Sequence, residues 1–183
     1  MRTVLSRLSF KKSMKKLKPE AFILDVDGVL TTGQFLYSKA GKMFKIFGPD
    51  DNDGLSLLKP LMNIEFLTQD KKGFPISKKR IVNDMKYPLH LIPTLKRIEW
   101  IQKKYSLKKV IYMGDGIFDH YVFSKVGYAI APANADPLAK KNADYVTKRN
   151  SGERAVAEAC IHILQKFFDV SDISSILENK KLV

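Results

Sequence analysis

The chain has 183 residues, of which 45% are hydrophobic, and this suits one compact domain with its own core. Its net charge of +13 attracts anions, but the basic residues are scattered as lysine pairs and form no nucleic-acid motif, so we expect no dedicated nucleic-acid binding. No apolar run approaches the roughly 18 residues that span a bilayer, and the lone cysteine cannot form an internal disulfide, so we expect a cytoplasmic protein without a membrane partner.

The two ends of the chain differ from its middle. Residues 1–19 contain no acidic residue and are predicted to form a basic extension or short surface helix, with an amphipathic membrane helix as the alternative. They lack the apolar centre and cleavage site of a secretory signal. Residues 20–170 are predicted to form the main domain, and residues 171–183 a C-terminal helix and tail.

The main domain opens with an apolar run at residues 21–24 that ends abruptly in D-V-D-G. This pattern predicts a strand buried on both faces, with polar chemistry at its C-terminal end. Residues 34–47 predict a β-hairpin that turns around Ala40 and Gly41. A helix is expected to start near Asp53.

Strand and helix patterns then alternate, which predicts βαβ units. The fold class is therefore α/β, a Rossmann-like three-layer α/β/α sandwich with a mostly parallel central sheet. Such sheets bind ligands at the carboxyl ends of their strands. Strands are predicted at 64–68, 109–113, 128–131 and 145–146, and helices near 76–85, 94–105, 117–125, 135–141 and 152–168.

Two acidic clusters each follow a predicted buried strand. The first contains Asp25 and Asp27, and the second, G-D-G-I-F-D, contains Asp115 and Asp119. Carboxylates are seldom buried unless they are paired or bind a metal, and four of them at one sheet edge would repel each other strongly. A hard cation such as Mg²⁺, which binds carboxylate, water and phosphate oxygens, offsets this repulsion. The two clusters together predict a magnesium site.

These segments resemble the motifs of haloacid dehalogenase-type phosphatases. D-V-D-G-V-L-T resembles the first motif, I-E-F-L-T-Q the second and G-D-G-I-F-D the fourth. The order of elements over roughly residues 20–165 resembles the small cap-less branch that contains 3-deoxy-D-manno-octulosonate 8-phosphate phosphatase. The resemblance implies a small β-hairpin flap at residues 34–47 and no large cap domain.

The resemblance also implies a role for each motif residue in a magnesium-dependent phosphomonoester hydrolase. Asp25 would attack phosphorus and form an aspartyl-phosphate. Asp27 would protonate the leaving alcohol and then activate water, and its main-chain carbonyl would bind Mg²⁺ together with Asp25 and Asp115. Asp119 would support a metal-bound water or the lysine of the third motif, and Thr68 would donate a hydrogen bond to phosphate.

The third motif of the family supplies a lysine that neutralises the phosphoryl charge. Lys96 is predicted to be this lysine, because it lies early in a helix after the apolar segment 89–92. Lys86 is the runner-up, and an ordinary surface lysine is the alternative for Lys96.

The residues that would read the substrate match the branch less well. Gln69 and Asp70 stand where it usually has Gly-Arg, and the added negative charge is expected to weaken binding of a sugar acid unless Lys71 or Lys72 compensates. The predicted substrate-binding residues are Gly28, Asp51, Gln69 and Arg154. Of these, Arg154 would start the last helix, a natural anion site, with a surface salt bridge as the alternative.

The leading functional hypothesis is a phosphatase for a small metabolite, either 3-deoxy-D-manno-octulosonate 8-phosphate or a nine-carbon sugar acid 9-phosphate, in lipopolysaccharide or sialic acid type biosynthesis. Alternatives are a phosphatase for another small phosphate ester and a catalytically silent regulatory module. The resemblance also implies a homotetramer, because related enzymes without a cap cover the open site by associating as tetramers, with apolar flap residues at the interface; packing of the hairpin on its own domain is the alternative. These flap residues are Phe35, Tyr37, Phe44 and Phe47.

Overall fold

The structure is a computed structural model that describes residues 18–174. Most of the predicted N-terminal extension and the end of the predicted C-terminal tail lie outside the described residues. Within residues 18–174, none of the helices has the length and apolar character needed to cross a bilayer.

A six-stranded sheet forms the centre of the domain, and all of its strand pairs are parallel. Its order is β5–β4–β1–β6–β7–β8, so the first strand lies in the middle. The strands are β1 (Ala21–Asp25), β4 (Asn63–Thr68), β5 (Leu89–Leu91), β6 (Val110–Met113), β7 (Tyr128–Ala131) and β8 (Tyr145–Val146). The predicted α/β class is confirmed. Strand β5 was not predicted, because three residues are too few to give a periodic pattern.

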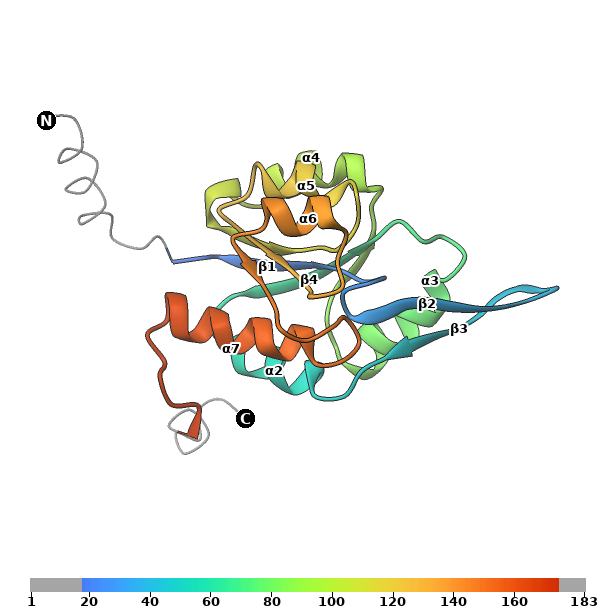
Figure 1. The fold of residues 1–183 in the computed structure, drawn as a ribbon, viewed down its shortest axis with the longest axis horizontal. Coiled ribbons are helices and arrows are strands. Elements are labelled where there is room, and N and C mark those ends of the chain that lie inside the picture. The colour runs from blue at the N-terminus through green and yellow to red at the C-terminus, as the bar shows by residue number, and fades with distance from the viewer. Residues whose placement is uncertain (1–17, 175–183) are drawn as a thin grey trace, which may run out of the picture.

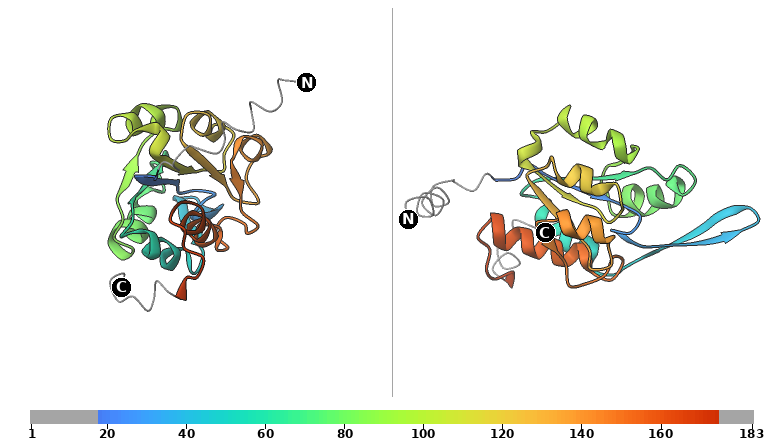
Figure 2. Two further views of the ribbon diagram at one scale, coloured as in Figure 1. Left: turned by 90° about the vertical axis from the view of Figure 1, so that its left-hand side faces the viewer. Right: turned by 45° about the horizontal axis from the view of Figure 1, so that its top comes forward.

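Helices cover both faces of the sheet, as Figures 1 and 2 show. One face carries α2 (Asp51–Leu58) and α7 (Ala155–Phe167), and the other carries α4 (Arg97–Gln102), α5 (Asp119–Phe123) and α6 (Pro137–Asn142). Helices α2 and α7 touch at Gly54, where a Cβ atom would lie 2.7 Å from the Cα atom of Ala157. A glycine there allows the two helices to pack closely.

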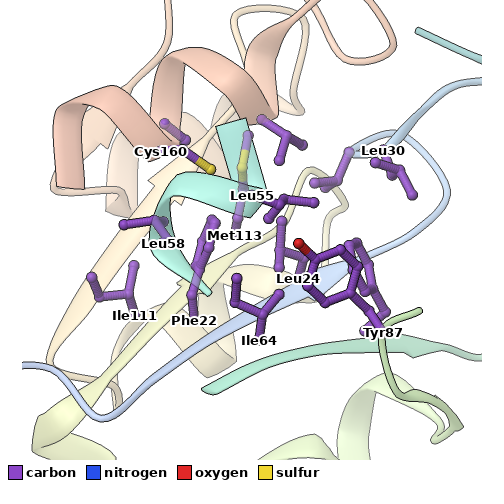
Figure 3. Close-up of a cluster of buried hydrophobic side chains, with 14 of the residues drawn as sticks. Phe22, Leu24, Leu30, Leu55, Leu58, Ile64, Tyr87, Ile111, Met113 and Cys160 are labelled. Carbon is purple, nitrogen blue, oxygen red and sulfur yellow. The ribbon is translucent and has the colours of Figure 1, made fainter. Parts of the chain in front are cut away.

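Alternate side chains of β1 pack into two separate parts of the core, one on each face of the sheet. Phe22 and Leu24 belong to the larger part, which lies between the sheet and helices α2 and α7 (Figure 3). Ala21 and Ile23 belong to the part on the opposite face. Cys160 is a free cysteine that is buried in the larger part.

A β-hairpin projects beyond the sheet (Figure 1). Its strands are β2 (Thr31–Ser38) and β3 (Gly41–Phe47). The predicted hairpin is therefore confirmed, although its first strand begins three residues earlier than expected. Phe35, Tyr37 and Phe44 are exposed, as expected, whereas Phe47 is only partly exposed and packs against the core.

The remaining helical segments differ from the expected ranges mainly at their ends. Helix α3 (Phe74–Lys78) continues as a π-helical segment, η2 (Lys79–Asp84). The expected helix over 94–105 is split into a short 3₁₀ turn, η3 (Thr94–Lys96), and helix α4. Because α4 begins only at residue 97, the side chain of Arg97, and not that of Lys96, is buried.

Candidate active site

Three neighbouring strands end at the same edge of the sheet and carry the polar residues of the site. Asp25 ends β1, Thr68 ends β4, and Asp115 lies two residues beyond β6. One carboxylate oxygen from each of Asp25, Asp115 and Asp119 lies within 4.8 Å of the others. The fold therefore brings together the two acidic clusters that are far apart in the sequence.

The loop after β1 is shaped by local hydrogen bonds. The main-chain N–H of Val26 donates to Asp25 Oδ1 at 2.7 Å, and that of Gly28 donates to Thr31 Oγ1 at 3.3 Å. Gly28 has a φ of +84°, and a Cβ atom there would lie 2.0 Å from Asp115 Oδ2. Glycine is therefore required both by the turn and by the approach of Asp115.

Asp119 organises the loop that carries Asp115. Its Oδ2 accepts hydrogen bonds from the main-chain N–H groups of Asp115 at 3.1 Å and Gly116 at 2.9 Å. Its Oδ1 accepts one from the Tyr112 hydroxyl at 2.8 Å. Asp119 is buried, so these donors replace the water that its charge would otherwise need.

Arg97 supplies a buried positive charge beside Asp25 and Asp119. Its terminal nitrogens lie 3.0 and 3.1 Å from the two carboxylate oxygens of Asp25, and one of them lies 3.2 Å from Asp119 Oδ1. It also contacts the Tyr112 hydroxyl. The planar guanidinium thus forms a two-point pair with Asp25, an arrangement that a lysine cannot make.

The structure does not bring Lys96 into this cluster. Its side chain is 71% exposed and lies 3.6 Å from the carboxylate of Glu99. Lys96 ends the 3₁₀ turn, whereas Arg97 starts α4 and shares an inward face with Ile101, four residues later. The runner-up, Lys86, lines a separate cavity beside Tyr87 and Pro88.

Asp27 is held by two neighbouring elements. The ammonium group of Lys45, from β3, lies 2.7 and 2.9 Å from its two carboxylate oxygens. The hydroxyl of Thr68, from β4, lies 3.5 Å away. Burial raises the pKa of Asp27 in spite of the hydrogen bond from Lys45. A carboxyl group with a raised pKa is suited to proton transfer near neutral pH.

The charge of Asp70 is balanced by the hairpin and not by Lys71 or Lys72. Lys42 Nζ lies 2.5 Å and Lys45 Nζ 3.0 Å from Asp70 Oδ2. Burial acts to raise the pKa of Asp70, but hydrogen bonds, first of all from Lys42, lower it to about 2. Asp70 is therefore a paired carboxylate at neutral pH.

These residues surround a cavity of about 710 Å³ whose lining includes Asp25, Asp27, Thr68 and Gln69. Two predicted substrate-binding residues lie elsewhere. Asp51 is buried between α2 and α7 and accepts a hydrogen bond from the main-chain N–H of Ala157 at 2.9 Å. Arg154 forms a surface salt bridge with Asp50, the alternative that the sequence left open. The start of α2 and the start of α7 therefore pair with each other, and neither Asp51 nor Arg154 lines the cavity.

Asp25 and Asp115 both have raised pKa values. Burial raises the pKa of Asp115 to about 8, and the charges of Asp25 and Asp119 contribute. Burial also raises the pKa of Asp25, although the Arg97 guanidinium opposes the shift. Burial is therefore the main cause of both shifts, and the repulsion between neighbouring carboxylates adds to it.

The sequence of this chain is related to proteins of known activity. Residues 95–160 match the haloacid dehalogenase-like hydrolase family. The chain is 34% identical over 149 residues to KdsC, the 3-deoxy-D-manno-octulosonate 8-phosphate phosphatase of Escherichia coli (strain K12), and the alignment covers 75% of each chain. The chain belongs to the haloacid dehalogenase-like phosphatases. The predicted family and the prediction of a phosphatase are confirmed.

Solved structures have the same fold as this phosphatase. The cobalt-bound form of deoxy-D-mannose-octulosonate 8-phosphate phosphatase from Haemophilus influenzae is similar with a TM-score of 0.78 and 26% identity, over 90% of this chain and 99% of that one. The 3-deoxy-D-manno-octulosonate 8-phosphate phosphatase from Yersinia pestis is similar with a TM-score of 0.70 and 26% identity, over 81% of this chain and 82% of that one. As expected for the cap-less branch, the hairpin is the insertion beside the site in the described part of the phosphatase.

Proposed function

We propose that this phosphatase hydrolyses the phosphate ester of a sugar acid through an aspartyl-phosphate on Asp25. The observation that carries the proposal is the gathering of Asp25, Asp27 and Asp115 at one cavity, with Thr68 beside them. The relation to KdsC supports an eight-carbon sugar acid 8-phosphate as the first substrate to test, and a nine-carbon sugar acid 9-phosphate as the second.

A divalent cation fits the residues present. Three carboxylates converge, and Gly28 has no side chain to fill the space beside Asp115. All-oxygen ligands are those that Mg²⁺ prefers. Asp25 and Asp115 would hold it with their side chains and Asp27 with its main-chain carbonyl. Asp119 already accepts four hydrogen bonds and is better suited to support the loop and Arg97. When bound, Mg²⁺ would add positive charge that stabilises the negative charge of the phosphoryl group during transfer.

The side chains divide the reaction into two displacements. In the first, a carboxylate oxygen of Asp25 bonds to phosphorus while the bond from phosphorus to the ester oxygen breaks, and the Asp27 carboxyl group gives its proton to that oxygen. In the second, the Asp27 carboxylate takes a proton from water as the water oxygen attacks phosphorus and releases Asp25. Arg97 offsets the negative charge beside Asp25, and the Thr68 hydroxyl is placed to donate to a phosphoryl oxygen.

A substrate panel tests the sugar-acid assignment. The purified phosphatase is assayed with Mg²⁺ on 3-deoxy-D-manno-octulosonate 8-phosphate, a nine-carbon sugar acid 9-phosphate, a neutral hexose phosphate and a nucleoside monophosphate. We expect the highest kcat/KM with one of the two sugar acid phosphates. A preference for the hexose phosphate or nucleotide would contradict the assignment.

One observation favours a second candidate, a phosphatase for a small ester without a carboxylate. The charged residues that line the cavity are aspartates apart from Lys42, and Lys42 is paired with Asp70. A sugar-acid carboxylate would therefore need to compete with Asp70 for this lysine or use a cation from a neighbouring copy. The same panel separates the two candidates.

We further propose a homotetramer in the cytoplasm. The exposed apolar side chains of the hairpin, among them Leu36, Tyr37 and Phe44, support association through this element. Sedimentation velocity of the phosphatase and of a Leu36→Ser/Phe44→Ser variant tests the assembly. A monomer for the unmodified chain would contradict it.

Gly28→Ala is expected to damage the metal site. The new Cβ atom would lie 2.0 Å from Asp115 Oδ2, and φ at this position is +84°. We expect affinity for Mg²⁺, measured by calorimetric titration, to fall at least about 10-fold, the scale for displaced metal ligands. Gly41→Ala is the control, because its φ is also positive, +113°, but nothing lies within 4 Å of the added atom. Equal affinities in the two variants would contradict the assigned site.

The stabilising effect of Mg²⁺ is expected to depend on pH. The pKa of Asp115 is about 8 in the folded chain and 3.8 ordinarily, so the folded state binds this proton more tightly and loses stability as pH rises between these values. Mg²⁺ competes with protons for the same oxygens. The rise in Tm on adding Mg²⁺ should be larger at about pH 8 than at about pH 5.

Asp115→Asn is the matched control for this pH dependence, because it removes the titrating group and keeps its shape. Its Tm should respond weakly to Mg²⁺ at both pH values. An equal rise for the unmodified phosphatase at the two pH values would be inconsistent with metal binding at Asp115.

A further inference from the structure

Lys45 is the buried residue of hairpin strand β3, and its ammonium group is fully occupied. Its side chain has 0% exposure. Nζ contacts both carboxylate oxygens of Asp27, lies 3.0 Å from Asp70 Oδ2 and donates to Ser77 Oγ at 2.9 Å. An ammonium group has three N–H donors. Asp27, Asp70 and Ser77 use all three, which leaves none for a substrate.

Asp70, which is one of these acceptors, is itself fixed in place. Its Oδ1 accepts a hydrogen bond from the main-chain N–H of Gly73 at 3.0 Å, and its Oδ2 contacts Lys42. A Cβ atom at Gly73 would lie 2.1 Å from Asp70 Oδ2 and 2.6 Å from Lys45 Cε. The packing around Lys45 therefore has no room for a side chain at this position.

Charge, more than apolar packing, fixes the middle of the hairpin to the domain. Lys45 is buried, whereas the apolar neighbours Met43, Phe44 and Ile46 on the same strand are exposed. Burying a lysine is costly unless it is paired and hydrogen-bonded, so the Lys45 contacts persist as a set. This set is attached to Asp27, whose carboxyl group could otherwise adopt other rotamers.

We propose that Lys45 is a positioning residue for Asp27, anchored by Asp70. Lys45 holds the Asp27 carboxyl group in the orientation from which its proton reaches the ester oxygen as the bond to phosphorus breaks and leaves its electron pair on that oxygen. The proposal rests on the proposed function, in which Asp27 is the acid. It assigns Asp70 to the support of catalysis instead of substrate recognition.

Two aryl phosphates with different leaving groups test this role. Phenol, with a pKa of about 10, needs a proton as it leaves, whereas p-nitrophenol is more acidic and departs readily as an anion. Lys45→Met should lower kcat/KM for phenyl phosphate about 100-fold, the scale of general acid catalysis, and for p-nitrophenyl phosphate less than about 5-fold. Lys45→Arg should restore much of the loss.

Lys104→Met is the matched control, because Lys104 pairs with the buried carboxylate of Glu65 away from the cavity. It should leave the ratio of the two kcat/KM values unchanged. In an Asp27→Asn background, Lys45→Met should have no further effect on phenyl phosphate, because the group that it positions is lost. An equal loss on both substrates, or the full Lys45→Met effect on top of Asp27→Asn, would overturn the proposal.

Two further measurements keep the test decisive. If Lys45→Met does not fold, Asp70→Asn should weaken the hold on Lys45 and shift the substrate ratio in the same direction; an unchanged ratio would overturn the proposal. A crystal structure of Lys45→Met, or of Asp70→Asn if Lys45→Met does not fold, should show the Asp27 carboxylate rotated from its present orientation. Retention of that orientation would also overturn the proposal. If the unmodified chain cleaves no phosphate ester, the proposed function fails, and the crystal structure alone decides the positioning.

Discussion

Asp25→Asn is expected to abolish phosphate ester hydrolysis. Asparagine fits the same space, but its amide oxygen is a poor nucleophile and carries no charge for the cation. Loss of a catalytic nucleophile commonly costs on the order of 10⁴-fold or more in kcat. The measurement is hydrolysis of p-nitrophenyl phosphate with Mg²⁺, followed by the release of nitrophenol.

Asp144→Asn is the matched control for this loss. Asp144 undergoes the same chemical change, and its Oδ2 accepts a hydrogen bond from the main-chain N–H of Ala129 at 2.8 Å, away from the cavity. An asparagine oxygen can also accept this hydrogen bond, so activity should stay close to that of the unmodified chain. Equal rates for Asp25→Asn and Asp144→Asn would remove Asp25 from the reaction.

Arg97→Met is expected to cost both stability and activity. Arg97 is buried and pairs with Asp25 and Asp119, so its loss leaves two buried carboxylates without their partner. Breaking such a group typically lowers the free energy of unfolding by about 3–5 kcal/mol. The rate should fall at least about 100-fold, because a donor aimed at the reacting group is lost. Urea unfolding and kcat/KM measure the two effects.

Arg97→Lys and Lys96→Met separate charge from position. Arg97→Lys keeps the charge but cannot pair with both oxygens of Asp25, so its rate should fall between those of the unmodified chain and Arg97→Met. Lys96→Met should change the free energy of unfolding by no more than about 0.5 kcal/mol, as surface substitutions usually do. A larger rate loss in Lys96→Met than in Arg97→Met would instead support the lysine predicted from the sequence.

The residues that could be predicted from the sequence are those that follow a buried strand directly. An apolar run that ends in acidic residues fixes both the strand and the edge at which Asp25 and Asp115 appear. Because β1 and β6 are parallel neighbours, they bring Asp25 and Asp115 together, and the conformation of the intervening loops does not alter this. This is why the acidic cluster could be predicted from two short segments far apart in the chain.

The strand pattern does not predict which of Lys96 and Arg97 points inward. Adjacent residues on a helix point about 100° apart, so a small error in the start of a helix exchanges the inward and outward side chains. A helix over 94–105 favoured Lys96, whereas the observed start at residue 97 turns Arg97 inward. The spacing of Arg97 and Ile101, four residues apart, is a signal in the sequence that could have identified the inward face.

Lys42 and Lys45 show a second limit. They approach Asp70 and Asp27 only because the folded hairpin places β3 beside the loops that follow β4 and β1. Nothing local in the hairpin sequence marks an inward lysine, since alternation on an exposed hairpin is expected to place charges outward. The chain near Asp70 offered Lys71 and Lys72 as partners, but the hairpin supplies them instead.

The proposed function requires Asp25 to carry the phosphoryl group during turnover. The most direct measurement is an acid quench of the phosphatase with substrate and Mg²⁺, reduction with borohydride, and mass spectrometry of the peptide around residue 25. An aspartyl-phosphate is reduced to homoserine, so we expect homoserine at position 25 in the reacted sample and aspartate in a sample without substrate. Homoserine at position 27, or intact Asp25 in every sample quenched during turnover, would contradict it.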